Sequence, residues 1–315
     1  MGNDRRDGIQ EKRMKPLFMK LIILLFTSLP LLAITATEIA QNAYNVNHSL
    51  YVKNIMIKKK KRAMITVIGR LPNKAPRITR LERFFSTEFD KSNIESKDLV
   101  IIRSGALKGL GVLMTAYTDT TKSHEYLMWL PALRKVRRMA EPKDAGLGAG
   151  DIAFLEDAKL RRFNEESYEL LETKKMDLDL KMMPYETNEF GSISKSIPYQ
   201  KSTILADKEI HIIKSTYKDK DHWYDYRISY IDTVSFTNYI SDYYKDGKLI
   251  KNVYRHWIPL EGQADPKAKI WYYWYGKDVN TGYEMVTYIP QKFIKVNEEV
   301  KKSFWSERTL QKIKR

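Results

Sequence analysis

The chain contains no cysteine among its 315 residues, and this absence excludes several classes of protein. Without thiols there is no disulfide scaffold, no cysteine-ligated zinc or iron–sulfur centre, and no thiol catalysis. A lipid attached through an N-terminal cysteine is excluded for the same reason. Packing and hydrogen bonding must therefore hold the fold together.

Acidic residues are scarce relative to basic ones. The chain has 39 Asp and Glu against 55 Lys and Arg, a formal net charge of +16. Its 43% hydrophobic and 12% aromatic residues can bury a sizeable core, so the chain is not a disordered tail. A positive field attracts nucleic acid, anionic lipid headgroups and other envelope polyanions alike. The net charge therefore predicts a negatively charged partner but does not identify it.

The first forty residues have the pattern of a secretory signal peptide. Basic side chains precede the uncharged stretch 21–37, and Ile34-Thr35-Ala36 provides a cleavage site before Thr37. A transmembrane helix needs about 20 apolar residues. The stretch here is shorter and is interrupted by Pro30, so an uncleaved inner-membrane anchor is the less favoured alternative.

These features give the expected organisation of the chain. Residues 1–36 are interpreted as a signal peptide, with Met14 as an alternative start, and residues 37–315 as a single domain located in the periplasm. No internal repeat and no change in composition marks a second domain.

Most of the remaining sequence predicts antiparallel strands joined by short turns. Alternation is clearest where Tyr224, Tyr226, Ile228 and Tyr230 are separated by Asp225, Arg227 and Ser229, which indicates one apolar and one wet face. Asp246-Gly247 is a two-residue hairpin signal. Ranges 50–57, 63–69, 78–89, 99–103, 110–117, 125–130, 224–230, 233–244, 248–257, 270–275 and 283–289 are predicted strands.

Few helices are expected in this chain. A short amphipathic helix is predicted over 37–45 with Thr37 as its cap, a second over 152–162, and a third from Ser303 onward. Residues 173–200 are interpreted as a long connection. The strand 270–275 is apolar or aromatic on both faces, so something is expected to cover each side of it.

No sequence pattern supports catalysis, a metal site or a cofactor. The glycines 146, 148 and 150 do not follow a strand as a phosphate-binding loop would. The five histidines lack metal-ligand spacing, and the carboxylate pairs at 156–157 and 177–179 are typical of solvated surfaces. Aromatic residues dominate faces expected to be buried, which argues against nucleic-acid stacking. We therefore expect a non-enzymatic protein that binds no nucleic acid.

Three segments carry a resemblance to a known family. They are Ile101-Ile-Arg-Ser-Gly-Ala-Leu-Lys-Gly109, Met128-Trp-Leu-Pro-Ala-Leu-Arg-Lys-Val-Arg-Arg-Met139 and Gly148-Ala-Gly-Asp-Ile-Ala-Phe-Leu-Glu-Asp157. In order and spacing they resemble the LolA-like outer membrane lipoprotein-sorting proteins. In that family the third segment is closer to Gly-Ser-Asp-Phe-Thr-Tyr-Glu-Asp, so this chain departs from the family pattern there.

The resemblance implies a mainly β fold, a curved antiparallel sheet forming a half-open β-barrel with short helices as lid. It also implies a carrier of lipid or acylated lipoprotein that works with an inner-membrane transporter and an outer-membrane acceptor. Aromatic and aliphatic side chains would contact acyl chains, and a basic cluster would hold an anionic headgroup or membrane surface. The acyl candidates are Trp129, Leu130, Phe154, Tyr226, Tyr230, Trp271 and Trp274; the headgroup candidates are Arg134, Lys135, Arg137 and Arg138.

Two other classes of function remain open at this point. The protein could be an envelope module for protein–protein interaction or for structural support, with side chains filling the interior of the sheet. The basic cluster could then protect a strand edge from aggregation. A hydrolase acting on envelope lipid or polysaccharide would need catalytic groups that the sequence does not show.

The signal peptide generates the first testable prediction. Protein recovered from the envelope of its own host should begin at Thr37, because signal peptidase cleaves after small residues such as Ala36. Intact-mass and N-terminal peptide analysis measure this directly. A recovered chain that retains residues 21–36 would instead establish the anchored alternative.

Overall fold

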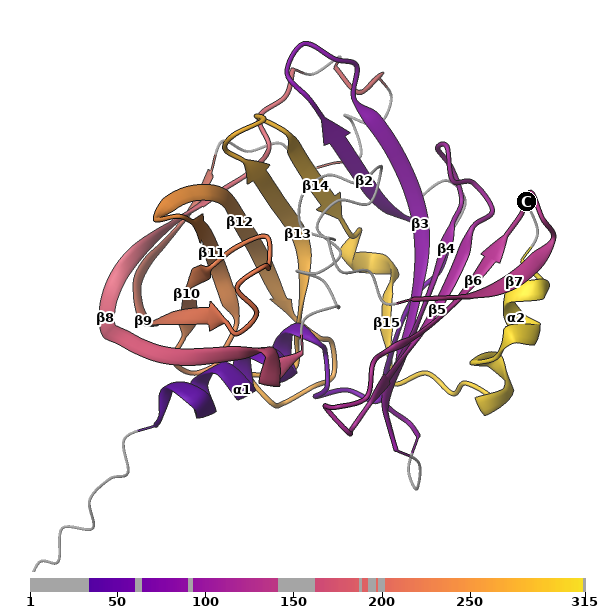
Figure 1. Ribbon diagram of the computed structural model, residues 1–315, viewed down its shortest axis with the longest axis horizontal. Helices are drawn as coiled ribbons and strands as arrows, with labels where there is room; N and C mark the ends of the chain where they lie inside the picture. Colours follow the sequence, from indigo (N-terminus) through magenta and orange to yellow (C-terminus); the bar gives the residue numbers. More distant parts are fainter. Residues whose placement is uncertain are drawn as a thin grey trace, which may run out of the picture. The chain divides into compact units, whose positions relative to one another are not determined.

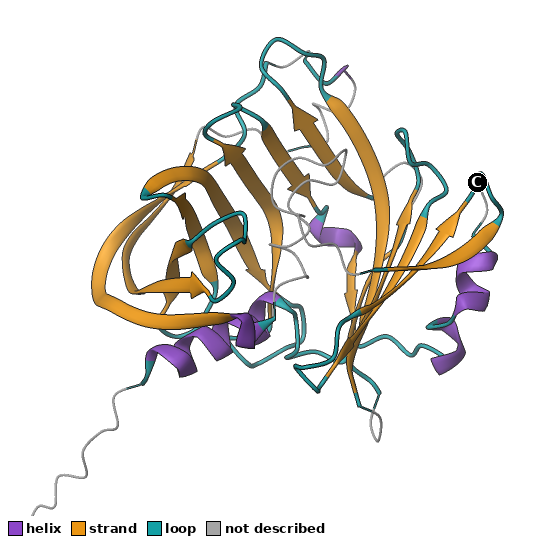
Figure 2. Ribbon diagram, viewed as in Figure 1, coloured by secondary structure: helices purple, strands orange, loops and turns teal. Residues whose placement is uncertain are grey.

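The computed structural model describes residues 34–59, 64–89, 93–140, 162–186, 189–191, 197 and 202–313. All of them belong to one compact unit that starts at Ile34. They form a 15-stranded antiparallel sheet with two short α-helices beside it (Figure 2). The predicted mainly β fold and the open, curved sheet are thus confirmed.

The first half of the sheet is a meander that runs from the middle of the sheet to one edge. It follows helix α1 (Ala36–Asn47) and the short strand β1 (Asn54–Ile57), which lies beside β3. Its strands are β2 (Ile65–Arg70), β3 (Arg77–Ser86), β4 (Ile94–Ile102), β5 (Gly111–Tyr117), β6 (Glu125–Leu130) and β7 (Lys135–Met139).

The second half is a meander that runs from the other edge back to the middle. Its strands are β8 (Glu166–Lys181), β9 (Ser202–Tyr217), β10 (Tyr226–Asp232), β11 (Asn238–Lys245), β12 (Lys248–Pro259), β13 (Lys269–Asp278) and β14 (Glu284–Tyr288). Strand β15 (Ile294–Val296) then pairs with β1, and helix α2 (Glu307–Gln311) follows. Three 3-10 turns complete the described elements: Phe163–Glu165, Gln291–Phe293 and Lys302–Phe304.

The two meanders join where β2 pairs with β14. The strand order is β7-β6-β5-β4-β3-β2-β14-β13-β12-β11-β10-β9-β8, so two strands that follow one another in sequence, β7 and β8, lie at opposite edges (Figure 1). Arg70 on β2 reinforces the junction, because its guanidinium forms ion pairs with Glu284 of β14, at 2.5 Å, and with Glu189. Glu284 also accepts a hydrogen bond from the Tyr275 hydroxyl of β13 at 2.5 Å.

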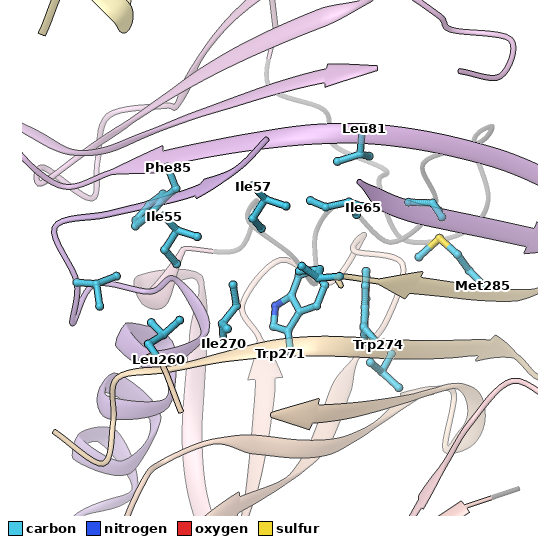
Figure 3. Packing of buried hydrophobic residues seen from close by; sticks show 14 of the residues in the cluster. Ile55, Ile57, Ile65, Leu81, Phe85, Leu260, Ile270, Trp271, Trp274 and Met285 are labelled. Atoms are coloured by element: carbon cyan, nitrogen blue, oxygen red, sulfur yellow. The ribbon is translucent and has the colours of Figure 1, made fainter. Parts of the chain in front are cut away.

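The inner face of the sheet, defined here as the face that carries Phe85 and Trp274, holds the main core. Figure 3 shows side chains from β1 and β3 meeting those of β13 and β14 across the curve of the sheet. Trp271 and Trp274 are 8% and 4% exposed, and Phe85 is fully buried. On the described residues, the inside of the curve is therefore filled by the chain's own side chains.

The outer face, which carries Phe84 and Tyr275, is covered by two separate segments. Met182, Met183 and Tyr185, which follow β8, pack on the outer side of β13 and β14. The C-terminal segment packs on the outer side of β3 to β7 through Trp305 and Leu310. Strand β13 is thus covered on both sides, as its sequence predicts.

Helix α1 is longer than predicted and its cap lies earlier in the chain. It runs from Ala36 to Asn47, and the Thr35 side chain, not that of Thr37, accepts the N–H of Glu38 at 3.2 Å. The Glu38 carboxylate in turn accepts the Thr35 N–H at 2.8 Å, which completes a capping box. The Thr-x-x-Glu pattern that defines such a box starts at Thr35, so this cap exists only in the chain that has not been cleaved before Thr37.

The interpretation of residues 173–200 as a connection is wrong for its first nine residues, 173–181. Residues up to Lys181 belong to the 16-residue strand β8, which pairs with the equally long β9. Leu178 and Leu180 are buried while their neighbours are exposed, a period of two that the sequence Met-Asp-Leu-Asp-Leu already carries. The charged and exposed middle of β8 obscured that signal.

The predicted wet face of strand 224–230 is also wrong. Arg227 and Ser229 are buried, whereas Tyr226 and Tyr230 are only partly buried. The polar side chains point inward, where they bond to one another beneath α1. By contrast, the Asp246-Gly247 hairpin is confirmed: both residues have positive φ, 50° and 70°, as the tight turn between β11 and β12 requires.

The junction of the two meanders generates a stability prediction. Arg70→Met should lower the free energy of unfolding by about 1–3 kcal/mol, because it leaves a largely buried carboxylate without its main partner. Adding Glu284→Gln should restore part of the loss, as removal of both charges costs less than removal of one. Urea titration of the four proteins of the cycle measures the coupling, and strict additivity would contradict it.

Candidate ligand-binding groove

Helix α2 lies beside the strands β6 and β7 at one edge of the sheet (Figure 1). A groove of about 390 Å³ lies where they meet. Trp129 and Val136 give it an apolar side, and Arg134 and Lys135 give it a basic side. Pockets for small molecules occupy roughly 300–1,000 Å³. The groove is therefore large enough for a ligand and offers it apolar and cationic surfaces together.

The hairpin of β6 and β7 positions these side chains. Trp129 lies directly opposite Val136 in the antiparallel register, so the two apolar side chains are neighbours on the outer face. Arg134 ends the connecting turn with φ 50°, in the left-handed region. That conformation reverses the chain and places Lys135 at the start of β7.

The basic cluster predicted from the sequence lies on this hairpin and is exposed. Arg134, Lys135, Arg137 and Arg138 are all solvent-exposed, which keeps their charges fully hydrated. Arg138 forms an ion pair with Glu125 of β6. Only the first two of these four line the groove, so the structure divides the cluster into groove residues and edge residues.

Helix α2 supplies the other side of the groove through Glu307 and Gln311. The Gln311 amide donates to the Glu307 carboxylate at 3.0 Å. Leu310, on an adjacent side of the helix, is fully buried against the sheet. Burying a leucine stabilises by about 1.5–3 kcal/mol, so this contact is the principal anchor of α2.

The other predicted acyl contacts are not assembled at one place. Trp271 and Trp274 lie in the inner core, and Tyr226 and Tyr230 lie on the outer face of β10. The ring of Tyr226 stacks on that of Tyr244 with 4.8 Å between centroids. Leu130 points to the opposite face from Trp129, and Phe154 lies outside the described residues.

A second, much smaller cavity of about 40 Å³ lies beneath α1. It is lined by Ala40 and Ala43 of the helix and by Arg227 and Arg255 of the sheet, among other residues. This volume suits a few water molecules. This cavity was not predictable from the sequence, because alternation marks a polar face without showing that a helix of small residues will cover that face.

Several of the polar groups around this cavity form hydrogen bonds with one another. Glu166 accepts two N–H bonds from Arg227, at 3.0 and 2.6 Å, and one from the Tyr224 hydroxyl at 2.9 Å. Buried charges need such pairing, because an unpaired one is costly in a low-dielectric interior. Burial also raises the pKa of nearby Tyr44 well above its usual range, and the charge of Glu95 adds to the shift. These contacts indicate a structural role.

The described part of the chain contains neither a cluster of metal ligands nor a helix that could span a membrane. Across it, His, Asp and Glu side chains nowhere gather in groups of three or more that could hold a metal ion. Nor does any helix there have the length and apolarity to cross a membrane.

Residues 90–311 match the family of proteins of unknown function DUF1329, so the chain belongs to that family. A comparison with curated proteins found no match. Among solved structures, a DUF1329 family protein from Desulfovibrio piger is similar, with TM-score 0.60 and 12% identity over 87% of this chain and 98% of the other.

Two further solved structures have a similar fold. A candidate outer membrane lipoprotein-sorting protein domain from Vibrio parahaemolyticus aligns with TM-score 0.60 and 14% identity, over 88% of this chain and 98% of the other. A LolA superfamily protein from Nitrosomonas europaea aligns with TM-score 0.52 and 14% identity, over 88% of this chain and all of the other. The LolA-like fold implied by the sequence resemblance is thus confirmed.

Proposed function

We propose that this protein is a non-enzymatic periplasmic carrier that binds lipid or an acylated protein. The observation that carries the proposal is the groove at β6, β7 and α2, which places an apolar side beside two cationic side chains. An amphiphile with an acyl chain and an anionic head matches both surfaces. The lipoprotein-sorting description of a similar structure supports the same class of ligand.

The physical basis of transfer is the hydrophobic effect. Each buried methylene contributes about 0.8 kcal/mol, so affinity grows with chain length and a better apolar host can take the ligand over. Such a carrier needs no bond to be made or broken. It would receive its ligand from an inner-membrane transporter and release it to an outer-membrane acceptor.

The filled inner face favours a second candidate, a protein–protein interaction module of the envelope. Because Trp271 and Trp274 are core residues, the inside of the curve offers no space to an acyl chain on the described residues. A partner would then bind at the exposed edge of the sheet. An inability to take up acyl chains in the experiment below would favour this module.

The carrier proposal predicts uptake of one fluorescent fatty acid per chain. Trp129→Ala, and the pair Arg134→Glu with Lys135→Glu, should each weaken uptake at least about tenfold, since 1.4 kcal/mol corresponds to that factor. The matched control is Arg137→Glu with Arg138→Glu, which changes the charge equally outside the groove. Native mass spectrometry of protein purified from its own envelope would identify the natural ligand. Equal loss in both charge variants would refute the assignment to the groove.

Approach to the membrane depends on all four basic side chains. Both charge-reversal pairs should weaken binding to anionic lipid vesicles, by an amount that shrinks as salt rises, because juxtamembrane Lys and Arg each contribute about 1 kcal/mol at low screening. Vesicle flotation at two ionic strengths measures this effect. If neither charge reversal nor added salt changes vesicle binding, the four basic side chains do not bind the lipid headgroups.

A further inference from the structure

We infer that the C-terminal tail, residues 300–313, covers a hidden acyl-binding face on β3 to β7, and that a single-chain anionic amphiphile displaces it. This inference rests on the proposed function and extends its site. In this inference the ligand enters at the groove, and its acyl chain lies on the sheet surface that the tail now covers.

The covered face is a continuous apolar surface. Cross-strand pairing places Phe84 opposite Leu99, Leu99 opposite Leu113, and Leu113 opposite Leu127. This first row crosses four strands and so spans roughly 14 Å, given the spacing between neighbouring strands. All four side chains belong to one hydrophobic cluster with the tail residues Trp305 and Leu310.

A second row beside the first contains a notch. Ile101 pairs with Gly111, Gly111 with Trp129, and Trp129 with Val136. At Gly111 the missing side chain leaves room that the tail fills: a Cβ there would lie 2.2 Å from Cδ1 of Ile313. The rows thus form one apolar surface with a notch at Gly111, which Ile313 fills.

The tail is held to this face mainly by side chains. Its backbone N–H groups donate within the tail, as from Phe304 to Lys301 and from Ile313 to Leu310. Across to the sheet, Lys97 donates to the Trp305 carbonyl at 3.2 Å. No strand pairing has to be broken to open the tail, so the cost of opening is the exposure of its buried side chains, chiefly Trp305 and Leu310.

The groove and the covered face share two residues. Trp129 and Val136 line the groove and also belong to the cluster beneath the tail. An acyl chain entering the groove therefore meets the second row directly, while its head stays beside Arg134 and Lys135. The tail resembles such a ligand, because it combines an apolar part, Leu310 and Ile313, with an anionic group, the carboxylate of Glu307. Glu307 also lines the groove.

Hydrogen exchange tests the displacement directly. Hexadecanoic acid at saturation should increase amide exchange in residues 304–313, while ligand binding at an unrelated site would leave it unchanged or slow it. The methyl ester of the same acid should bind more weakly, because it lacks the charge that Arg134 and Lys135 recognise. Stoichiometric binding with an unaltered or better protected tail would overturn the inference and leave the carrier function standing. Failure to bind either probe would instead refute the carrier function itself.

A matched pair of leucine truncations provides an independent test. Leu310→Ala should tighten hexadecanoic acid binding by about tenfold, since weakening a competing segment raises the fraction of binding-competent protein. Leu260→Ala truncates a leucine of the inner core that is also buried, at 4% exposed, and should not tighten binding. Equal or weaker affinity in Leu310→Ala, with the tail still folded by hydrogen exchange, would contradict displacement.

Discussion

The pairing of β2 with β14 is the constraint on which the rest of the structure depends. It joins the two meanders into one sheet, and Arg70 links both halves through Glu284 and Glu189. Because the two meanders run outward from this junction, it also fixes which strands become edges. The groove lies at one of these edges, so its position follows from a contact made in the middle of the sheet.

The two faces of the sheet have different roles in this arrangement. The inner face is a packed core in which aromatic side chains leave no room, and its volume cannot change without loss of stability. The outer face is covered by segments that pack on it without joining the sheet at those points. In a carrier, adaptation to a ligand would therefore belong to the covering segments and leave the sheet unchanged.

Local sequence patterns predicted most of the strands and the Asp246-Gly247 turn, because alternation and turn chemistry are local properties. They failed at β8, where exposed charges interrupt the period of two, and at β10, where α1 covers the polar face. Of the candidate site, Trp129, Arg134 and Lys135 do come together. The contribution of α2 was not predictable, since Glu307 reaches β7 only through tertiary packing far along the chain.

The order of the strands also determines how the protein must fold. Strand β2 is among the first to be made, yet its partner β14 comes more than two hundred residues later. Until then β2 presents an apolar and unpaired edge of six residues, the kind of surface on which chains associate with one another. A chain of this topology is therefore most prone to association with other chains between the synthesis of its first meander and the synthesis of its last strands.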